Sequence, residues 1–130
     1  MPAPCSFDYA IIRVVPRVER EEFLNAGVIL YCLAQDFLEA RVHLDPARLL
    51  ALAPDADVDT LRTHLEAIPL ICRGGPEAGP IGRLSQKERW HWLISPRSTL
   101  VQTSPVHSGL CADPAQALDK LLRRMVLLER

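Results

Sequence analysis

Six consecutive apolar residues, Val28 to Leu33, constrain the fold of this chain more than any other feature. An uninterrupted apolar run of this length is typical of a strand that is covered on both faces. A short polar stretch, residues 34–36, follows it, and residues 37–44 then alternate between apolar and polar side chains. The sequence therefore predicts a β-hairpin of strands 28–34 and 37–44. Because the first strand needs cover on both sides, we expect this hairpin to form the centre of the sheet.

The alternation divides the second strand of the hairpin into two faces. Its core face is apolar and consists of Leu38, Ala40, Val42 and Leu44. Its other face is predicted to point outward and consists of Phe37, Glu39, Arg41 and His43. Residues 8–15 are rich in β-branched side chains and end before Pro16, which predicts an N-terminal strand. The uncharged face of this strand, formed by Ala10, Ile12 and Val14, is the predicted core face.

Capping residues mark the beginnings of four predicted helices. Asp45-Pro46 begins a helix over residues 45–52, and Asp57 begins one whose apolar stripe continues to Cys72. Pro69 is expected to kink or end that second helix, because proline lacks a backbone donor. A capping box over residues 85–88 begins a third helix, and Asp113-Pro114 begins the last. The apolar stripe of the last helix consists of Leu118, Leu121, Leu122, Met125 and Leu128.

The order of these elements predicts an α+β fold. We expect a small, mainly antiparallel sheet made of the N-terminal strand, the central hairpin and one late strand over residues 99–103, packed against three to four helices. A length of 130 residues with 48% hydrophobic content suits a single domain over residues 1–130. Residues 1–5 are the expected flexible segment, and residues 73–82 the expected exposed loop.

Charge and cysteine usage exclude several function classes. A net charge of −1 creates no global field for nucleic acid or an anionic membrane. The four cysteines are spread along the chain without zinc-ligand spacing, so we expect buried thiols and no metal site. We expect no signal peptide, because the first residues have no basic segment before an apolar one, and no apolar run is long enough to span a membrane. These features predict a cytoplasmic protein, and no motif indicates a cofactor.

The stretch from Arg20 to Val28 reads Arg-Glu-Glu-Phe-Leu-Asn-Ala-Gly-Val and follows a strand that carries Tyr9 and Arg13. With a Pro-Arg-centred segment at residues 95–107, it resembles the bacterial family known as domain of unknown function 3037. Glu21 departs from the family pattern, in which a small residue is more usual. The resemblance implies no established activity. It does imply an accessory role beside proteins that resemble HipA-type kinases, so the expected partner is another protein.

Two accounts of the first motif remain open. Asn25 and Gly27 suit a tight turn or bulge into a strand, and Arg20 with Glu22 suit an ion pair that holds the loop. Alternatively, Arg20, Glu22 and Asn25 form one wall of a binding site at the mouth of a strand.

The second motif is equally open to two interpretations. Arg97 and Ser98 suit a turn into a strand, but they also suit an anion site built from a guanidinium group and hydroxyls. His107 lies in a predicted loop and is a candidate general base with Ser104 or Ser108. No nucleotide-binding or hydrolase motif accompanies these residues.

Three functions follow from these features. The favoured one is a non-enzymatic interaction module that binds a protein partner through the sheet or the C-terminal helix. The second is a small enzyme or anion-binding domain that uses Arg97, His107, Glu22 and Asn25 in one pocket. The third is a nucleic-acid binder built on Arg89, Trp90 and Trp92. The first two predict different geometry, because the second requires Arg97 to reach Glu22 or a ligand beside Asn25.

Overall fold

The computed structural model describes residues 4–97 and 99–127. Within this part of the chain, an antiparallel sheet of five strands has the order β3-β2-β1-β4. The fifth strand, β5, pairs with the other half of β1, along the same side as β4. The strands are β1 (Cys5–Val14), β2 (Leu24–Cys32), β3 (Phe37–Val42), β4 (Val101–Thr103) and β5 (His107–Cys111).

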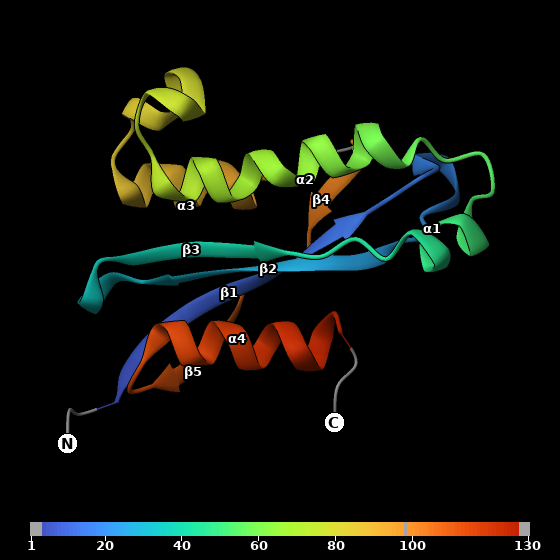
Figure 1. Cartoon of the computed structure of the whole chain (residues 1–130). Coiled ribbons are helices and arrows are strands. Elements are labelled where there is room, and N and C mark those ends of the chain that lie inside the picture. Colours follow the sequence, from blue (N-terminus) through green and yellow to red (C-terminus); the bar gives the residue numbers. More distant parts are fainter. Residues whose placement is uncertain (1–3, 98, 128–130) are drawn as a thin grey trace.

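Helices cover both faces of the sheet (Figure 1). One face is covered by α2 (Val58–Arg73) and α3 (Gln86–Ile94), and the opposite face by α4 (Pro114–Met125). The short helix α1 (Pro46–Leu52) lies at one end of the sheet. The 3-10 segments are Val18–Arg20, Leu33–Gln35 and Pro76–Arg83, the last of which occupies the predicted exposed loop. The predicted α+β class is confirmed.

Two hydrophobic cores follow from this arrangement. The core beneath α2 and α3 contains Ala10, Ile12 and Val14, as the sequence predicts. The second core, beneath α4, contains Phe7, Ile11, Val28, Leu30, Cys32 and Leu118. Phe37 packs against this second core, so the predicted solvent face of residues 37–43 is partly covered. The amphipathic α4 is responsible, since its apolar stripe needs the second face of the sheet.

The predicted hairpin is present, but its position in the sheet differs from the prediction. β2 lies inside the sheet between β3 and β1, whereas β3 has a neighbour on one side only. A hairpin at the centre of the sheet would have a further strand on each side. Here only the β2 side has one, which is β1. Leu33 lies beyond β2 in a 3-10 turn and is 65% exposed, so the apolar run is buried only as far as Cys32.

The late strand of the prediction is two strands. β4 pairs with the second half of β1, and β5, where a loop was predicted, pairs with the first half. Ser104 and Pro105 separate them, and the pairing register shifts by one residue across this break. Apolar and polar residues alternate only weakly in β5, His-Ser-Gly-Leu-Cys. This strand therefore depends on its pairing with β1 and not on a strand pattern of its own.

The predicted helix starts are confirmed. Asp45, Asp57 and Asp113 each accept hydrogen bonds from backbone N–H groups of the first helical turn, and Ser85 forms a capping box with Glu88. Pro69 does not end α2, which continues to Arg73, because Ile71 and Cys72 beyond it are buried in the first core. Leu128 of the predicted last stripe, and residues 1–3 of the predicted flexible segment, lie outside the described residues, whereas Cys5 begins β1.

Two of the cysteines match their prediction and two do not. Cys32 and Cys72 are buried thiols. Cys5 and Cys111 are half-buried and lie opposite each other in the pairing of β1 with β5. None of the helices within residues 4–97 and 99–127 has the length and apolar character needed to cross a bilayer.

Candidate functional site

The outer edge of β3, called the β3 edge below, exposes a row of main-chain groups. In an antiparallel pair, residues alternate between hydrogen-bonding the neighbouring strand and pointing their N–H and C=O groups away from it. The N–H of His43 donates to the carbonyl of Ala26 at 2.7 Å, which sets the phase of this alternation. Consequently Leu38, Ala40 and Val42 direct their main-chain groups away from β2, and no other described strand pairs with them.

A groove runs beside the first half of this edge, between β3 and the second half of α2. It has a volume of about 320 Å³ and is called the edge groove below. Its lining consists of residues 36–40 from the hairpin, Pro69, Cys72 and Arg73 from α2, and Gln86 and Arg89 from α3. One main-chain group at the hairpin end is occupied, because Gln86 donates from its side-chain amide to the carbonyl of Asp36 at 2.9 Å.

Hydrogen bonds join the two helices that wall the edge groove. Arg89 donates to the carbonyls of Leu84, Ile71 and Cys72, which ties the beginning of α3 to the end of α2. Burial raises the pKa of the Cys72 thiol to about 12, although Arg89 acts in the opposite direction. Cys72 is therefore a neutral thiol at physiological pH and contributes shape rather than reactivity.

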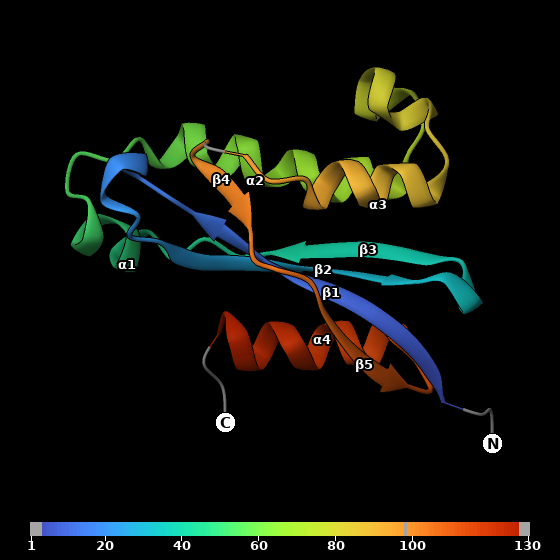
Figure 2. The ribbon, with the colours of Figure 1, turned by 180° about the vertical axis from the view of Figure 1, so that it is seen from behind.

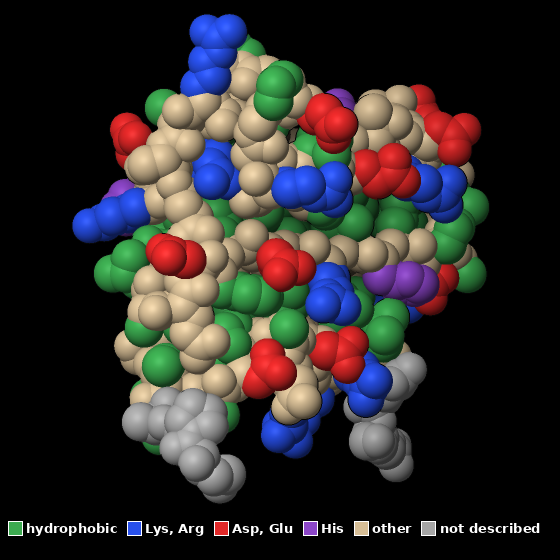
Figure 3. Space-filling model, turned by 60° about the vertical axis from the view of Figure 1, so that its left-hand side comes forward, with side chains coloured by type: hydrophobic (Ala, Val, Ile, Leu, Met, Phe, Trp, Pro, Cys, Tyr) green, Lys and Arg blue, Asp and Glu red, His purple; other side chains and the backbone are tan. Residues whose placement is uncertain are grey.

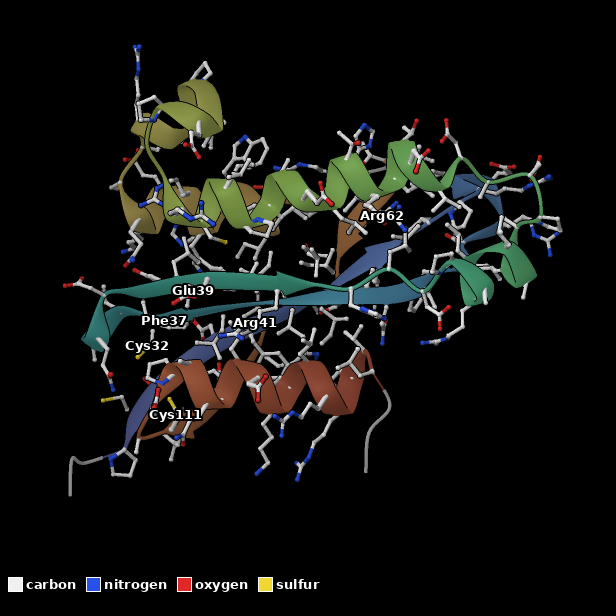
Figure 4. All side chains as sticks on the ribbon, viewed as in Figure 1. Cys32, Phe37, Glu39, Arg41, Arg62 and Cys111 are labelled. Carbon is white, nitrogen blue, oxygen red and sulfur yellow. The ribbon has the colours of Figure 1, made fainter. Side chains whose placement is uncertain are left out.

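Opposite charges alternate along the β3 edge. Phe37, Glu39 and Arg41 are pleated toward the α4 face, and Figure 4 labels them along the strand. The same side of the molecule shows acidic and basic side chains mixed with hydrophobic ones (Figure 3). The edge is thus suited to a partner of mixed charge, and no continuous basic surface of the kind that binds nucleic acid follows it.

Arg20 and Glu22 lie together in the loop that precedes β2. They form an ion pair, and both side chains are about half exposed. They line a cavity of about 220 Å³ with Pro16, Arg17, Leu52, Ala53 and Pro54, and Arg17 in turn pairs with Asp55 at 3.3 Å. Both arginines of this cavity therefore have acidic partners.

Asn25 has an architectural contact. Its side-chain amide donates to the carbonyl of Met125 at 3.1 Å, so it holds the C-terminus of α4 against β2. Arg48 supports the same helix end through the carbonyl of Val126. Two residues away, Gly27 leaves no room for a side chain, because a Cβ atom would lie 2.6 Å from the carbonyl oxygen of Arg41 in β3.

Arg97 lies in another cavity, of about 140 Å³, between α2, α3 and β4. Its guanidinium group stacks over the ring of Trp92 at 4.0 Å and donates to the Trp92 carbonyl. Partial burial lowers the pKa of Arg97, which nevertheless remains charged. The predicted contact between Arg97 and Glu22 is not formed, since Glu22 pairs with Arg20 from its own loop. Ser98 lies outside the described residues.

His107 begins β5 and packs its ring against Tyr9 at 5.4 Å between centroids. The two serines proposed to assist it have other contacts. Ser104 accepts from the N–H of Ile11 and donates to the carbonyl of Pro105, both at 2.8 Å, and Ser108 donates to Asp8 at 2.7 Å. Among residues 4–97 and 99–127, no cluster of side chains could hold a metal ion.

Comparison with known proteins agrees with the motif-based resemblance. The model of a family described as a protein of unknown function (DUF3037) matches residues 9–126, nearly the whole chain. The chain belongs to this family. No curated protein and no solved structure matches it. In this member of DUF3037, part of the first motif serves the fold, because Asn25 holds α4 and Gly27 lets β3 approach β2.

The β3 edge was not among the site residues that the sequence predicts. The signal for it is present in the alternation of residues 37–44, but an alternating strand can be central or peripheral. Which strand lies at the edge depends on where β1, β4 and β5 pair, and that is a long-range property.

Proposed function

We propose that this chain is a non-enzymatic, cytoplasmic interaction module that binds an extended segment of another protein by adding it as a strand to the β3 edge. The observation that carries the proposal is the row of outward main-chain groups at Leu38, Ala40 and Val42. Main-chain hydrogen bonds supply affinity in this binding mode, and pockets for alternate side chains supply specificity.

The surroundings of the edge support the proposal. An added strand lies about 4.8 Å beyond β3, and alternate side chains of such a strand point toward the α2 face, where the edge groove opens. Exposed edges of folded proteins are normally blunted by proline, bulges, short length or charged side chains, and of these β3 carries only the last, as one acidic and one basic residue. β3 contains no proline, and its pairing with β2 shows no register shift.

The alternative functions have less support. A site built from Arg97, His107, Glu22 and Asn25 needs these side chains in one pocket, but Glu22 and Arg97 line different cavities and Asn25 binds the end of α4. A stacking surface for nucleic acid needs exposed aromatic rings, and Trp90 is 3% exposed, whereas Trp92 is covered on one side by Arg97.

Proline at an outward-facing edge position tests the proposal. Ala40→Pro removes an outward N–H group and leaves the ladder to β2 intact, so the variant should fold but bind no added strand. Leu110→Pro is the matched control, because its N–H group faces outward from β5 on the opposite edge.

The measurement is co-purification with proteins of the native host, beginning with the HipA-like protein that the family resemblance suggests. We expect wild type and Leu110→Pro to retain the same partner and Ala40→Pro to lose it. Equal partner retention together with equal self-association by all three folded proteins would overturn the proposal.

A further inference from the structure

We propose that the strand added to the β3 edge is β3 of a second copy of this chain, in an antiparallel pair centred on Ala40. This inference rests on the proposed function, since it names the partner of the same edge. It comes from residues 37–43, Phe-Leu-Glu-Ala-Arg-Val-His, whose pattern of chemical types is nearly the same in both directions from Ala40.

The phase of the β2–β3 ladder limits the possible registers. Only Leu38, Ala40 and Val42 point their main-chain groups outward, so these residues must pair with one another in the dimer. Centring on Ala40 places Leu38 opposite Val42 of the second copy and Ala40 opposite itself. The three residues of each copy then form about six main-chain hydrogen bonds across the two-fold axis.

The charges select this register among its neighbours. In the pair centred on Ala40, Glu39 lies opposite Arg41 of the second copy, twice by symmetry. These residues occupy non-hydrogen-bonded positions, where facing side chains approach most closely. A pair centred on Glu39 would place two carboxylates opposite each other, and a pair centred on Arg41 would place two guanidinium groups opposite each other. Both alternatives are repulsive.

The remaining contacts are also complementary. Phe37 lies opposite His43 of the second copy, which pairs two aromatic rings on the α4 face. Toward the α2 face the facing side chains are apolar, because Leu38, Ala40 and Val42 belong to or adjoin the first core. In the single chain, neither Glu39 nor Arg41 has an ion-pair partner within the described residues.

Reversing the charges of Glu39 and Arg41 tests the register centred on Ala40. Glu39→Arg and Arg41→Glu should each weaken self-association at least tenfold, because each places like charges opposite each other. An equimolar mixture of the two variants should associate as a heterodimer, and the double variant Glu39→Arg/Arg41→Glu should recover the wild-type homodimer. Sedimentation velocity from about 1 to about 500 µM covers the affinities expected for a short edge pair. Glu39 is exposed and Arg41 only half-buried, so the variants are expected to fold.

The outcomes separate this inference from the proposed function. A wild-type chain that stays monomeric throughout that range, or a dimer that both single variants leave unchanged, overturns the second-copy inference. If in that case Ala40→Pro still loses a different partner that Leu110→Pro retains, strand addition at the β3 edge stands with another occupant. If Ala40→Pro affects neither self-association nor partner retention, both proposals are overturned.

Discussion

The two edges of the sheet are built in opposite ways. The β3 edge is one uninterrupted strand of six residues, joined to β2 by a short turn and paired with it in constant register. The other edge, called the β4/β5 edge below, consists of two short strands that run along β1 (Figure 2). Ser104 and Pro105 interrupt it, and at this break a serine hydroxyl replaces a main-chain acceptor.

This difference shows which edge is protected from strand addition. A break with proline and a register shift removes the regular row of donors and acceptors that a further strand would need. The β4/β5 edge has such a break, although Leu110 there is 73% exposed. The β3 edge has none, and it carries one acidic and one basic side chain, Glu39 and Arg41.

The largest expected loss of stability comes from breaking the hydrogen-bond ladder between β3 and β2. Arg41 bonds to β2, whereas Ala40 faces outward, so Arg41→Pro should lower the free energy of unfolding by about 3 kcal/mol and Ala40→Pro by about 1 kcal/mol. Urea denaturation at low protein concentration measures both without a contribution from association. Equal losses would show that the assigned phase of the β3 ladder is wrong.

The next effect compares close packing at the two edges. In Gly27→Ala the new Cβ would meet the backbone of β3 at 2.6 Å, and backbone does not move aside cheaply. In Gly109→Ala it would meet the far end of the Phe7 ring at 2.7 Å, and a side chain shifts more readily than backbone. We expect losses of about 2 to 3 kcal/mol and about 1 kcal/mol respectively. The reverse order in thermal unfolding would mean that the β4/β5 edge is the more tightly held.

The smallest effect concerns the break in the β4/β5 edge. Ser104 is 5% exposed, and its hydroxyl accepts from the buried N–H of Ile11. Ser104→Ala leaves that donor without a partner and should cost about 1 to 2 kcal/mol. Ser108→Ala, which removes an exposed hydrogen bond to Asp8, should change stability by less than about 0.5 kcal/mol. A neutral Ser104→Ala variant would show that water satisfies this backbone group.

Local chemistry made the helices predictable. Each of the four helix starts carries a side-chain cap that satisfies backbone donors of its first turn, and this interaction spans only a few residues. The hairpin is equally local, because a short turn joins two segments of strand-like pattern. The core face of β1 followed from the same alternation, and Ile12 and Val14 are fully buried.

The candidate site residues have structural contacts that the sequence does not reveal, and the reason is physical. Arg20, Glu22 and Asn25 stand out in the sequence, but an ion pair and a helix contact account for two interactions that a ligand would otherwise use. A polar residue that supports the fold and one that binds a partner look alike until its neighbours are known. Arg97 illustrates this, since its stacking on Trp92 depends on how the chain turns after α3.

The sequence by itself determined the class of the fold, the helix starts and the pairing of residues 28–32 with 37–42, because these depend on periodicity, caps and one turn. Only the tertiary structure decided that β3 is an edge, that α4 creates a second core, and that β5, far along the chain, joins β1. Such pairings depend on which surfaces remain uncovered once the local elements have formed. The proposed site lies on the surface that stayed uncovered, and residues 37–43 already carried the alternating charges that a second copy would match.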